Sequence, residues 1–219
     1  MVAFPNSPRL IKGGIVLIDP DTSAVKRIIA LQYNPDTLTR TLQPQSVSSE
    51  GGDRSEALRL KGPPIETIKL DAEIDGTDQL ETGDPESNAA KYGIQPLLSA
   101  LETVVYPTSS QLLENNALAQ SGTLEIAPMQ APLTLFIWSK SRILPVRLTE
   151  FTITEEAFDP TLNPIRARVS LGMRVMSVTD LGFSHKGGSL FMVYQQQKER
   201  LAAMSQGGSL SGLGIGEIP

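Results

Sequence analysis

The sequence predicts a mainly β fold of the α+β class, with antiparallel strands, one packing helix and a C-terminal helix. The chain has 219 residues, of which 18 are Gly and 16 are Pro, a density of turn formers that is typical of many short strands. Several segments alternate apolar and polar residues with a period of two, whereas only two segments show helical spacing. Hydrophobic residues make up 40% and charged residues 20%, so the chain can bury a sizeable core.

The N-terminal third predicts a hairpin followed by a long loop. Residues 14–33 contain an apolar run, a turn at residues 19–23 and an alternating strand that ends before Pro35, because proline cannot continue a central ladder. Residues 43–57 are polar and rich in Ser and Gly, which predicts a loop. Residues 68–75 alternate again, so we expect a strand with one buried face, followed by a loop over residues 76–88.

The middle of the chain predicts the packing helix. Apolar residues between 94 and 105 follow helical spacing, with Pro96 in the first turn and Pro107 just past the end, which indicates a helix over about 95–105 that covers a sheet. Residues 108–131 are rich in Ser, Asn, Gln and Gly and predict a second loop.

The C-terminal half predicts three more strands. Residues 133–138 are apolar on both faces, which is typical of a central or interface strand. Apolar residues between 146 and 153 change parity, and a β-bulge near Thr149 and Glu150 would restore them to one face. After a turn at residues 159–164, a late strand over 165–178 alternates for longer than a usual strand.

The last part of the chain predicts a helix at about 189–204, with Ser189 as its N-cap, and a flexible Gly/Ser segment. We therefore expect a β domain over residues 10–182, a C-terminal helix within 183–206 and a flexible tail over 207–219.

Composition excludes several classes of function. Asp and Glu number 24 against 19 Lys and Arg, a net charge of −5, so a general nucleic-acid binder is not expected. Cysteine is absent, which excludes disulfides, thiolate zinc sites and cysteine nucleophiles. No secretory signal and no window of ~20 apolar residues is present. We therefore expect synthesis and folding in the cytosol, and no membrane insertion.

Two acidic groups could carry chemistry, but each has a plainer explanation. Glu155, Glu156 and Asp159 could form a hydrolytic pair, yet a solvated acidic loop explains them without a cleft. The acidic residues of the 68–75 strand are of the type that binds calcium, but the calcium-loop pattern is missing and a wet strand face accounts for their alternation.

The chain also lacks a recognisable nucleophile or phosphate site. His185, the single histidine, lies in a predicted exposed loop with no Gly-x-Ser-x-Gly sequence anywhere to supply a partner serine. Residues 186–189 have too little of the P-loop spacing to cradle a phosphate. The sequence therefore predicts no enzyme, no cofactor and no metal.

Three arginines are the most informative charges. Arg166, Arg168 and Arg174 lie on the polar face of the predicted late strand. That face could simply be solvated, or it could be a stripe between subunits or along a lumen, where arginines pair with carboxylates.

Five short blocks together resemble one protein family. The predicted hairpin ends in Leu-Gln-Tyr-Asn-Pro at residues 31–35, and the next strand ends in Leu-Asp-Ala-Glu-Ile-Asp-Gly at 70–76. A helix closed by Tyr-Pro follows, then Pro-Leu-Thr-Leu-Phe-Ile-Trp at 132–138 and Asn-Pro-Ile-Arg-Ala at 163–167. Over roughly residues 10–180 this arrangement resembles the tube-type domain of contractile injection systems, which are phage-tail-like particles.

The resemblance implies a split β-barrel or sandwich and a structural role without catalysis. It implies a ring, expected to be a hexamer, that joins the spike hub to the inner tube in the baseplate and initiates tube assembly. Inner-tube, spike or hub, other baseplate and sheath proteins would be partners in the assembled particle. The residues implied in assembly contacts are Tyr33, Asn34, Pro35, Trp138, Arg166, Arg168 and Arg174. The loops at 43–57 and 108–131 would contact neighbouring proteins.

The sequence departs from the family in two respects. Ser139 follows Trp138 where the family usually has Gly, and the chain leaves no room for the peptidoglycan-binding LysM module that many members carry. Two alternatives also stay open: the chain could be the repeating inner-tube subunit itself, or an unrelated enzyme or ligand-binding β-barrel.

Overall fold

A computed structural model describes residues 11–46, 59–80, 87–121, 131–205 and 207–218. Seven strands form one antiparallel sheet in the order β2-β1-β5-β6-β7-β4-β3, which confirms the predicted class. The sheet is not closed into a barrel, because β2 and β3 stand at its two ends. The strands are β1 (Gly14–Ile18), β2 (Val25–Ala30), β3 (Leu38–Gln43), β4 (Ile65–Asp75), β5 (Leu133–Ser139), β6 (Arg142–Phe158) and β7 (Pro164–Val175).

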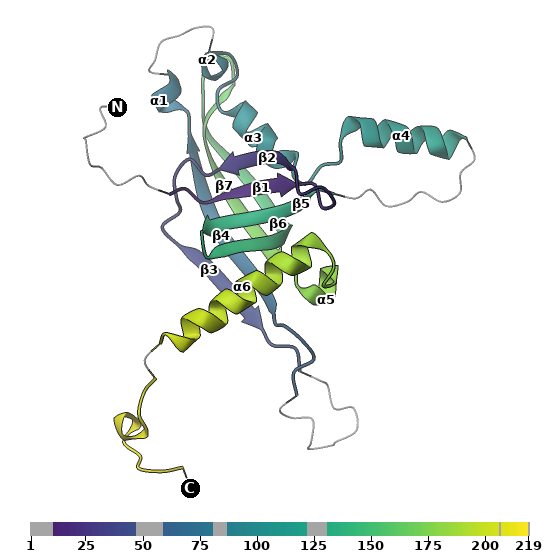
Figure 1. Ribbon diagram of the computed structural model, residues 1–219. Coiled ribbons are helices and arrows are strands. Elements are labelled where there is room, and N and C mark those ends of the chain that lie inside the picture. The colour runs from purple at the N-terminus through teal and green to yellow at the C-terminus, as the bar shows by residue number, and fades with distance from the viewer. Residues whose placement is uncertain (1–10, 47–58, 81–86, 122–130, 206, 219) are drawn as a thin grey trace.

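A bulge in β6 divides the sheet into two parts. The register between β6 and β7 shifts between Leu148 and Glu150, which confirms the predicted bulge and leaves Thr149 as the extra residue. A glycine is required opposite the bulge, because a Cβ on Gly172 would lie 2.7 Å from that of Glu150. Before the bulge β6 pairs with β5, and after it β6 pairs with β7 alone. Figure 1 shows β1, β2 and β5 crossing in front of the long strands β4 and β7.

The main core lies between these two parts. The alternating aliphatic residues of β4 and β7 point into it, and Phe136 of β5 meets them from the other side. The opposite face of β5 contributes Leu133 and Leu135 to a second cluster, which includes Leu181 and Leu190. Strand β5 is therefore a central strand, one of the two predicted possibilities, and its two apolar faces are both covered within one chain.

Helices close the ends of the core. Helix α3 (Gln95–Glu102) buries Leu98 and Leu101 against the sheet, which confirms the packing helix although it ends before residue 105. Helices α5 (Val178–Leu181) and α6 (Lys186–Ala203) cover the second cluster. The N-cap of helix α6 is His185, whose Nδ1 accepts a hydrogen bond from the Gly187 N–H at 3.0 Å. The predictions of Ser189 as N-cap and of His185 as an exposed loop residue are therefore wrong.

A buried polar cluster fixes α6 on the sheet. Arg40 of β3 donates to Glu66 of β4 at 2.7 Å and to the hydroxyl of Tyr194 of α6 at 2.8 Å. Glu66 and Tyr194 are buried. Burial opposes the charge on Arg40, but the hydrogen bond and charge of Glu66 outweigh it and raise the Arg40 pKa. Burial and the same carboxylate raise the pKa of Tyr194. The cluster joins three elements that are far apart in sequence.

Three predicted loops contain regular structure. Strand β3 occupies residues 38–43 and so reaches the first residue of the predicted 43–57 loop, most of which (47–58) lies outside the described residues. The 76–88 segment holds α1 (Thr77–Leu80) and the start of α2 (Asn88–Tyr92), with 81–86 not described. In the 108–131 segment, α4 (Ser109–Gln120) replaces the predicted loop, and 122–130 is not described.

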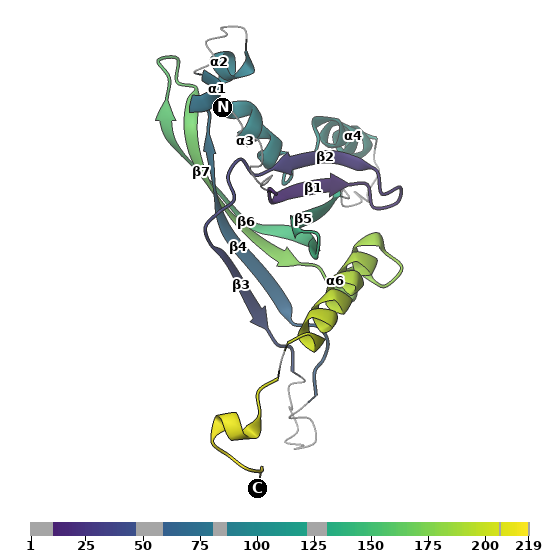
Figure 2. The same ribbon diagram turned by 60° about the vertical axis from the view of Figure 1, so that its left-hand side comes forward.

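Helix α4 begins at a capping box, in which Thr108 and Gln111 bond each other's backbone N–H groups. None of its residues is buried, and Figure 1 shows it standing away from the sheet. Figure 2 shows α1, α2 and α3 near one end of the long strands and the C-terminal segment beyond the other end. Among the described helices, none is both long and apolar enough to cross a lipid bilayer.

Candidate assembly surface

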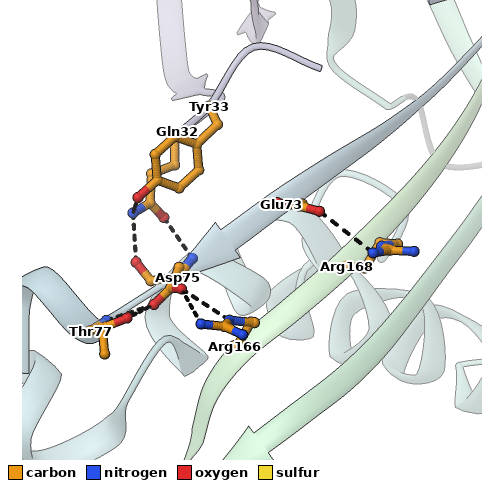
Figure 3. Close-up of polar contacts among 7 residues, drawn as sticks. All are labelled: Gln32, Tyr33, Glu73, Asp75, Thr77, Arg166 and Arg168. Carbon is orange, nitrogen blue, oxygen red and sulfur yellow. Dashed lines mark hydrogen bonds and ion pairs between the residues drawn. The ribbon is translucent and has the colours of Figure 1, made fainter. Parts of the chain in front are cut away.

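The polar face of the long strands carries matched charges. The register of β4 and β7 places Asp75 opposite Arg166, Glu73 opposite Arg168 and Asp71 opposite Ser170. Arg166 forms an ion pair with Asp75 at 2.8 Å, and Arg168 reaches Glu73 at 3.5 Å, as Figure 3 shows. The acidic residues of β4 and the arginines of β7 therefore form one ladder of pairs across two neighbouring strands.

Two further cations on this face have carboxylate partners, whereas Arg147 of β6, which lies across from Arg174, forms no ion pair within the described residues. Lys69 of β4 reaches the bulged Glu150 of β6 at 2.6 Å, and Arg174 reaches Asp180 at 2.7 Å. Arg168 also lies 3.9 Å from Glu156. The three predicted arginines thus have carboxylate partners within their own chain. Exposed pairs of this kind contribute about 0–1 kcal/mol each to folding, so their main effect is a polar, nearly balanced surface.

Asp75 is the most constrained carboxylate in the ladder. The side-chain hydroxyl and backbone N–H of Thr77 both donate to it, and together with Arg166 they lower the pKa of Asp75. Asp71 accepts a hydrogen bond from Ser170 at 2.6 Å. In the described part of the chain, no group of three or more His, Asp or Glu side chains is arranged to hold a metal ion.

The segment after β2 attaches to both parts of the sheet. The Gln32 side-chain amide donates to the Asp75 carbonyl at 2.6 Å and accepts from the Asp75 N–H at 3.0 Å. Strand β3 does not pair with this end of β4, so Gln32 supplies the hydrogen bonds that the Asp75 backbone would otherwise make to a neighbouring strand (Figure 3). Asn34 accepts from the Gly13 N–H at 2.9 Å and donates to the Ile11 carbonyl at 2.8 Å.

The structure brings some of the predicted assembly residues together and separates others. Tyr33, Asn34, Pro35 and Arg168 line one open cavity of about 450 Å³. Trp138 stacks on Phe136 and packs against Gly13, where a Cβ would lie 2.8 Å from the indole, and it is not among the residues that line this cavity.

Arg166 lies next along the same face, paired with Asp75. Arg174 lies near the opposite end of β7, directly across from Arg147 of β6. Its Nε is buried and has no hydrogen-bond partner in the described residues. Gln32 was not among the predicted residues, although it stands inside the Leu-Gln-Tyr-Asn-Pro block.

The four long strands also have two unpaired edges. Strand β3 pairs with β4 alone, and β6 has no strand beyond Val146 on the side away from β7 within the described residues. The polar face at these edges carries threonines, Thr39 and Thr41 on β3 and Thr152 and Thr154 on β6. The core face carries apolar side chains, among them Leu42, which is 47% exposed, and the half-buried Phe151.

Each edge carries only part of the usual protection against pairing. Charged residues pointing inward, β-bulges, prolines or covering loops normally blunt an edge strand. Arg40 of β3 points to the core face and bonds Glu66, and β6 has the bulge and the charged Glu150. Strand β3 contains no proline, and residues 151–154 of β6 are threonines and apolar residues. Both edges therefore have backbone hydrogen-bonding groups that no other strand in the described residues pairs.

Comparisons with known proteins give only distant likeness. No protein-family model and no curated protein matches the sequence. Among solved structures, one chain from the tail of an empty gene transfer agent particle with C6 symmetry aligns at 11% identity, over 75% of this chain and 90% of that chain, with a TM-score of 0.30. A chain from the virion of a native gene transfer agent particle aligns at 11% identity, over 74% and 90%, with a TM-score of 0.26.

Proposed function

We propose that this chain is a structural subunit of a phage-tail-like contractile injection system. Copies of it would form a baseplate ring that joins the spike hub to the inner tube and initiates tube assembly. The observation that carries this proposal is the pair of unpaired edges on the four-stranded part of the sheet, β6-β7-β4-β3. The resemblance of the sequence blocks to the tube-type domain supports the same role.

The four strands β6-β7-β4-β3 are an even number, which favours ring closure. Neighbouring strands are antiparallel throughout, so β3 runs opposite to β6. When copies are related by rotation, β3 of one copy meets β6 of the next in antiparallel orientation, and the alternation continues without a break. Because the two edges differ, the contact is heterologous, which generates a ring if the rotation closes.

The side chains at the two edges also match. On the polar face, Thr39 and Thr41 of one copy would meet Thr152 and Thr154 of the next, and such cross-strand pairs stabilise antiparallel sheets by about 0.2–1 kcal/mol each. On the core face, Leu42 would cover the half-exposed Phe151. Each junction would therefore continue both the hydrogen-bonded ladder and the apolar layer.

In such a ring the charged ladder of β4 and β7 would line the channel. The opposite face is already covered by β1, β2, β5 and α3, which leaves the polar face for the lumen. Arg166, Arg168 and Arg174 would then be lumen residues held by their own carboxylates rather than contacts to a neighbour. The role would be structural, with no chemical reaction and no cofactor.

The experiment is a measurement of native mass on the purified chain, with variants at one edge. We expect a species six times the mass of one chain, visible as rings by electron microscopy. Leu42→Lys should convert it to monomer while the circular dichroism spectrum stays unchanged, because a lysine at an edge strand opposes pairing. Leu112→Lys, at an equally exposed leucine of α4, is the matched control and should still form rings.

A chain that stays monomeric at high concentration, or rings that survive Leu42→Lys, would contradict the proposal. The inner-tube subunit remains the second candidate, since the same edges would serve it. Counting copies in a purified particle separates the two: one ring for the initiator, many for the tube. A ligand-binding β-barrel has little support, because the sheet of one chain does not close around an interior.

A further inference from the structure

The C-terminal segment (207–218) presents a formed apolar turn to solvent. Leu210–Leu213 form one turn of 3₁₀ helix, capped by the Ser209 hydroxyl and by Gly214, which has φ 75°. Because residues three apart lie on the same side of a 3₁₀ helix, Leu210 and Leu213 face the same way. Leu213 is 77% exposed, and Ile215 and Ile218 are exposed as well.

An apolar groove of about 420 Å³ lies between the end of the hairpin, β4 and α3. Its apolar walls are Ile29, Leu31, Ile74, Leu97 and Leu101. Leu97 is 41% exposed, although Leu98 and Leu101 of the same helix are buried. Ile29, Leu31 and Ile74 are buried as well, so among these five apolar wall residues Leu97 alone is exposed to solvent.

The groove and the segment lie apart within one copy. Figures 1 and 2 place the C-terminal segment beyond the end of α6, whereas α3 lies toward the other end of the long strands. In the described part of the chain, the segment makes no hydrogen bond to the sheet or to α3. A second copy is the occupant that can bring the two together.

Charge complementarity supports the same occupant. Lys12 stands at the rim of the groove and forms no ion pair among the described residues. Glu217 follows the leucine turn by four residues and is likewise exposed. Glu73 is the one carboxylate among the residues that line the groove, and it already lies close to Arg168. A turn seated by Leu210 and Leu213 would bring Glu217 toward an available cation.

We propose that the Leu210–Leu213 turn of one copy docks in the groove of another copy. The contact runs from one end of a molecule to the other end of the next, so it differs from the lateral β3–β6 junction and would join one ring to a second layer. A contact of this kind can repeat, and more than two stacked rings of this chain in a particle would favour the second candidate function, the inner-tube subunit, over the initiator.

The test uses the absence of native cysteine. Leu97→Cys and Leu213→Cys are made as two separate full-length proteins with different tags, mixed and oxidised. Docking raises the effective concentration of the two thiols, so we expect 97–213 disulfides to form about ten times more than in a mixture of Leu112→Cys and Leu213→Cys. Leu112 is the control because it is similarly exposed on α4. Adding Leu210→Ser to the Leu213→Cys protein should reduce the yield to the control level.

Equal cross-linking at positions 97 and 112, or yields unchanged by Leu210→Ser, would overturn the inference. The result is independent of the ring. Cross-links without rings would refute the proposed function and leave the docking intact. Rings of the protein with native Leu42, without 97–213 cross-links, would refute the docking and leave the proposed function intact. Cross-links that form only when a tube or spike protein is added would also reject a second copy as the occupant.

Discussion

The two parts of this sheet differ in how completely one chain finishes them. Strand β5 and its neighbours are covered on both faces, by the main core on one side and by α5 and α6 on the other. Strands β6, β7, β4 and β3 are covered on one face only and have two edges that no other strand in the described residues pairs. The closed part can carry the stability of the isolated chain, while the open part is available for assembly.

The largest expected effect separates the two parts by a matched pair of phenylalanines. Phe136 is 1% exposed in the main core, and Phe136→Ala should lower the free energy of unfolding by about 3–5 kcal/mol. Phe158, at the far end of β6, is 49% exposed, and Phe158→Ala should cost less than about 1 kcal/mol. Urea denaturation of both variants measures the difference. Equal losses would mean that the open part is as essential to the monomer as the closed part.

The second prediction compares two glutamates on β4. Glu66→Ala removes the buried partner of Arg40 and Tyr194 and should destabilise the fold by about 2–4 kcal/mol, because a partly buried cation loses its partner. Glu73→Ala removes only the exposed pair with Arg168 and should cost about 0–1 kcal/mol. Chemical denaturation at neutral pH checks both. If Glu73→Ala proved the worse of the two, the polar face would be contributing to the monomer's stability.

The third prediction concerns Gln32, whose side chain bonds the exposed edge of β4. Gln32→Ala leaves the Asp75 N–H and carbonyl without their partner and should cost about 1–2 kcal/mol. Hydrogen exchange should show faster exchange at the Asp75 amide in particular. Gln195→Ala, which loses one exposed bond to Glu199 on α6, is the control and should leave both quantities nearly unchanged.

The smallest effect is a pH dependence at the tip of the open part. Thr161 and Asn163 donate to the Asp159 carboxylate and lower its pKa from 3.8 to about 2. Because the folded-state pKa is the lower one, the stabilisation is complete above about pH 4 and is lost as the pH falls toward 2. A carboxyl NMR titration should show the low pKa. In Asp159→Asn, the slope of stability against pH between 4 and 2 should be shallower than in the wild type.

The strands that could be predicted from the sequence are those that bury a regular set of side chains. The alternation in β4 and β7, the two-faced run in β5 and the parity change at Thr149 each predicted the observed strand. Strand β3 was missed because Arg40 interrupts its apolar positions, and that arginine is accommodated only by Glu66 and Tyr194, which are distant in sequence. Helix α4 was missed because it buries no residue and so has no apolar stripe.

The candidate surface was only partly predictable for a similar reason. The stripe of Arg166, Arg168 and Arg174 follows from strand periodicity, but its carboxylate partners depend on the register between β4 and β7. The role of Gln32 depends on where β3 begins and leaves the β4 edge bare. His185 gave no local sign of its capping role beyond its position before two glycines.

The two unlike edges have a consequence for mixtures of intact and altered copies. A copy damaged at β3 alone still offers a sound β6, so it can join a growing arc on one side and then halt it. Such a copy would act as a chain terminator, and a minority of damaged subunits would prevent most rings from closing. Damage at both edges would be milder in a mixture, because that copy could not enter an arc at all.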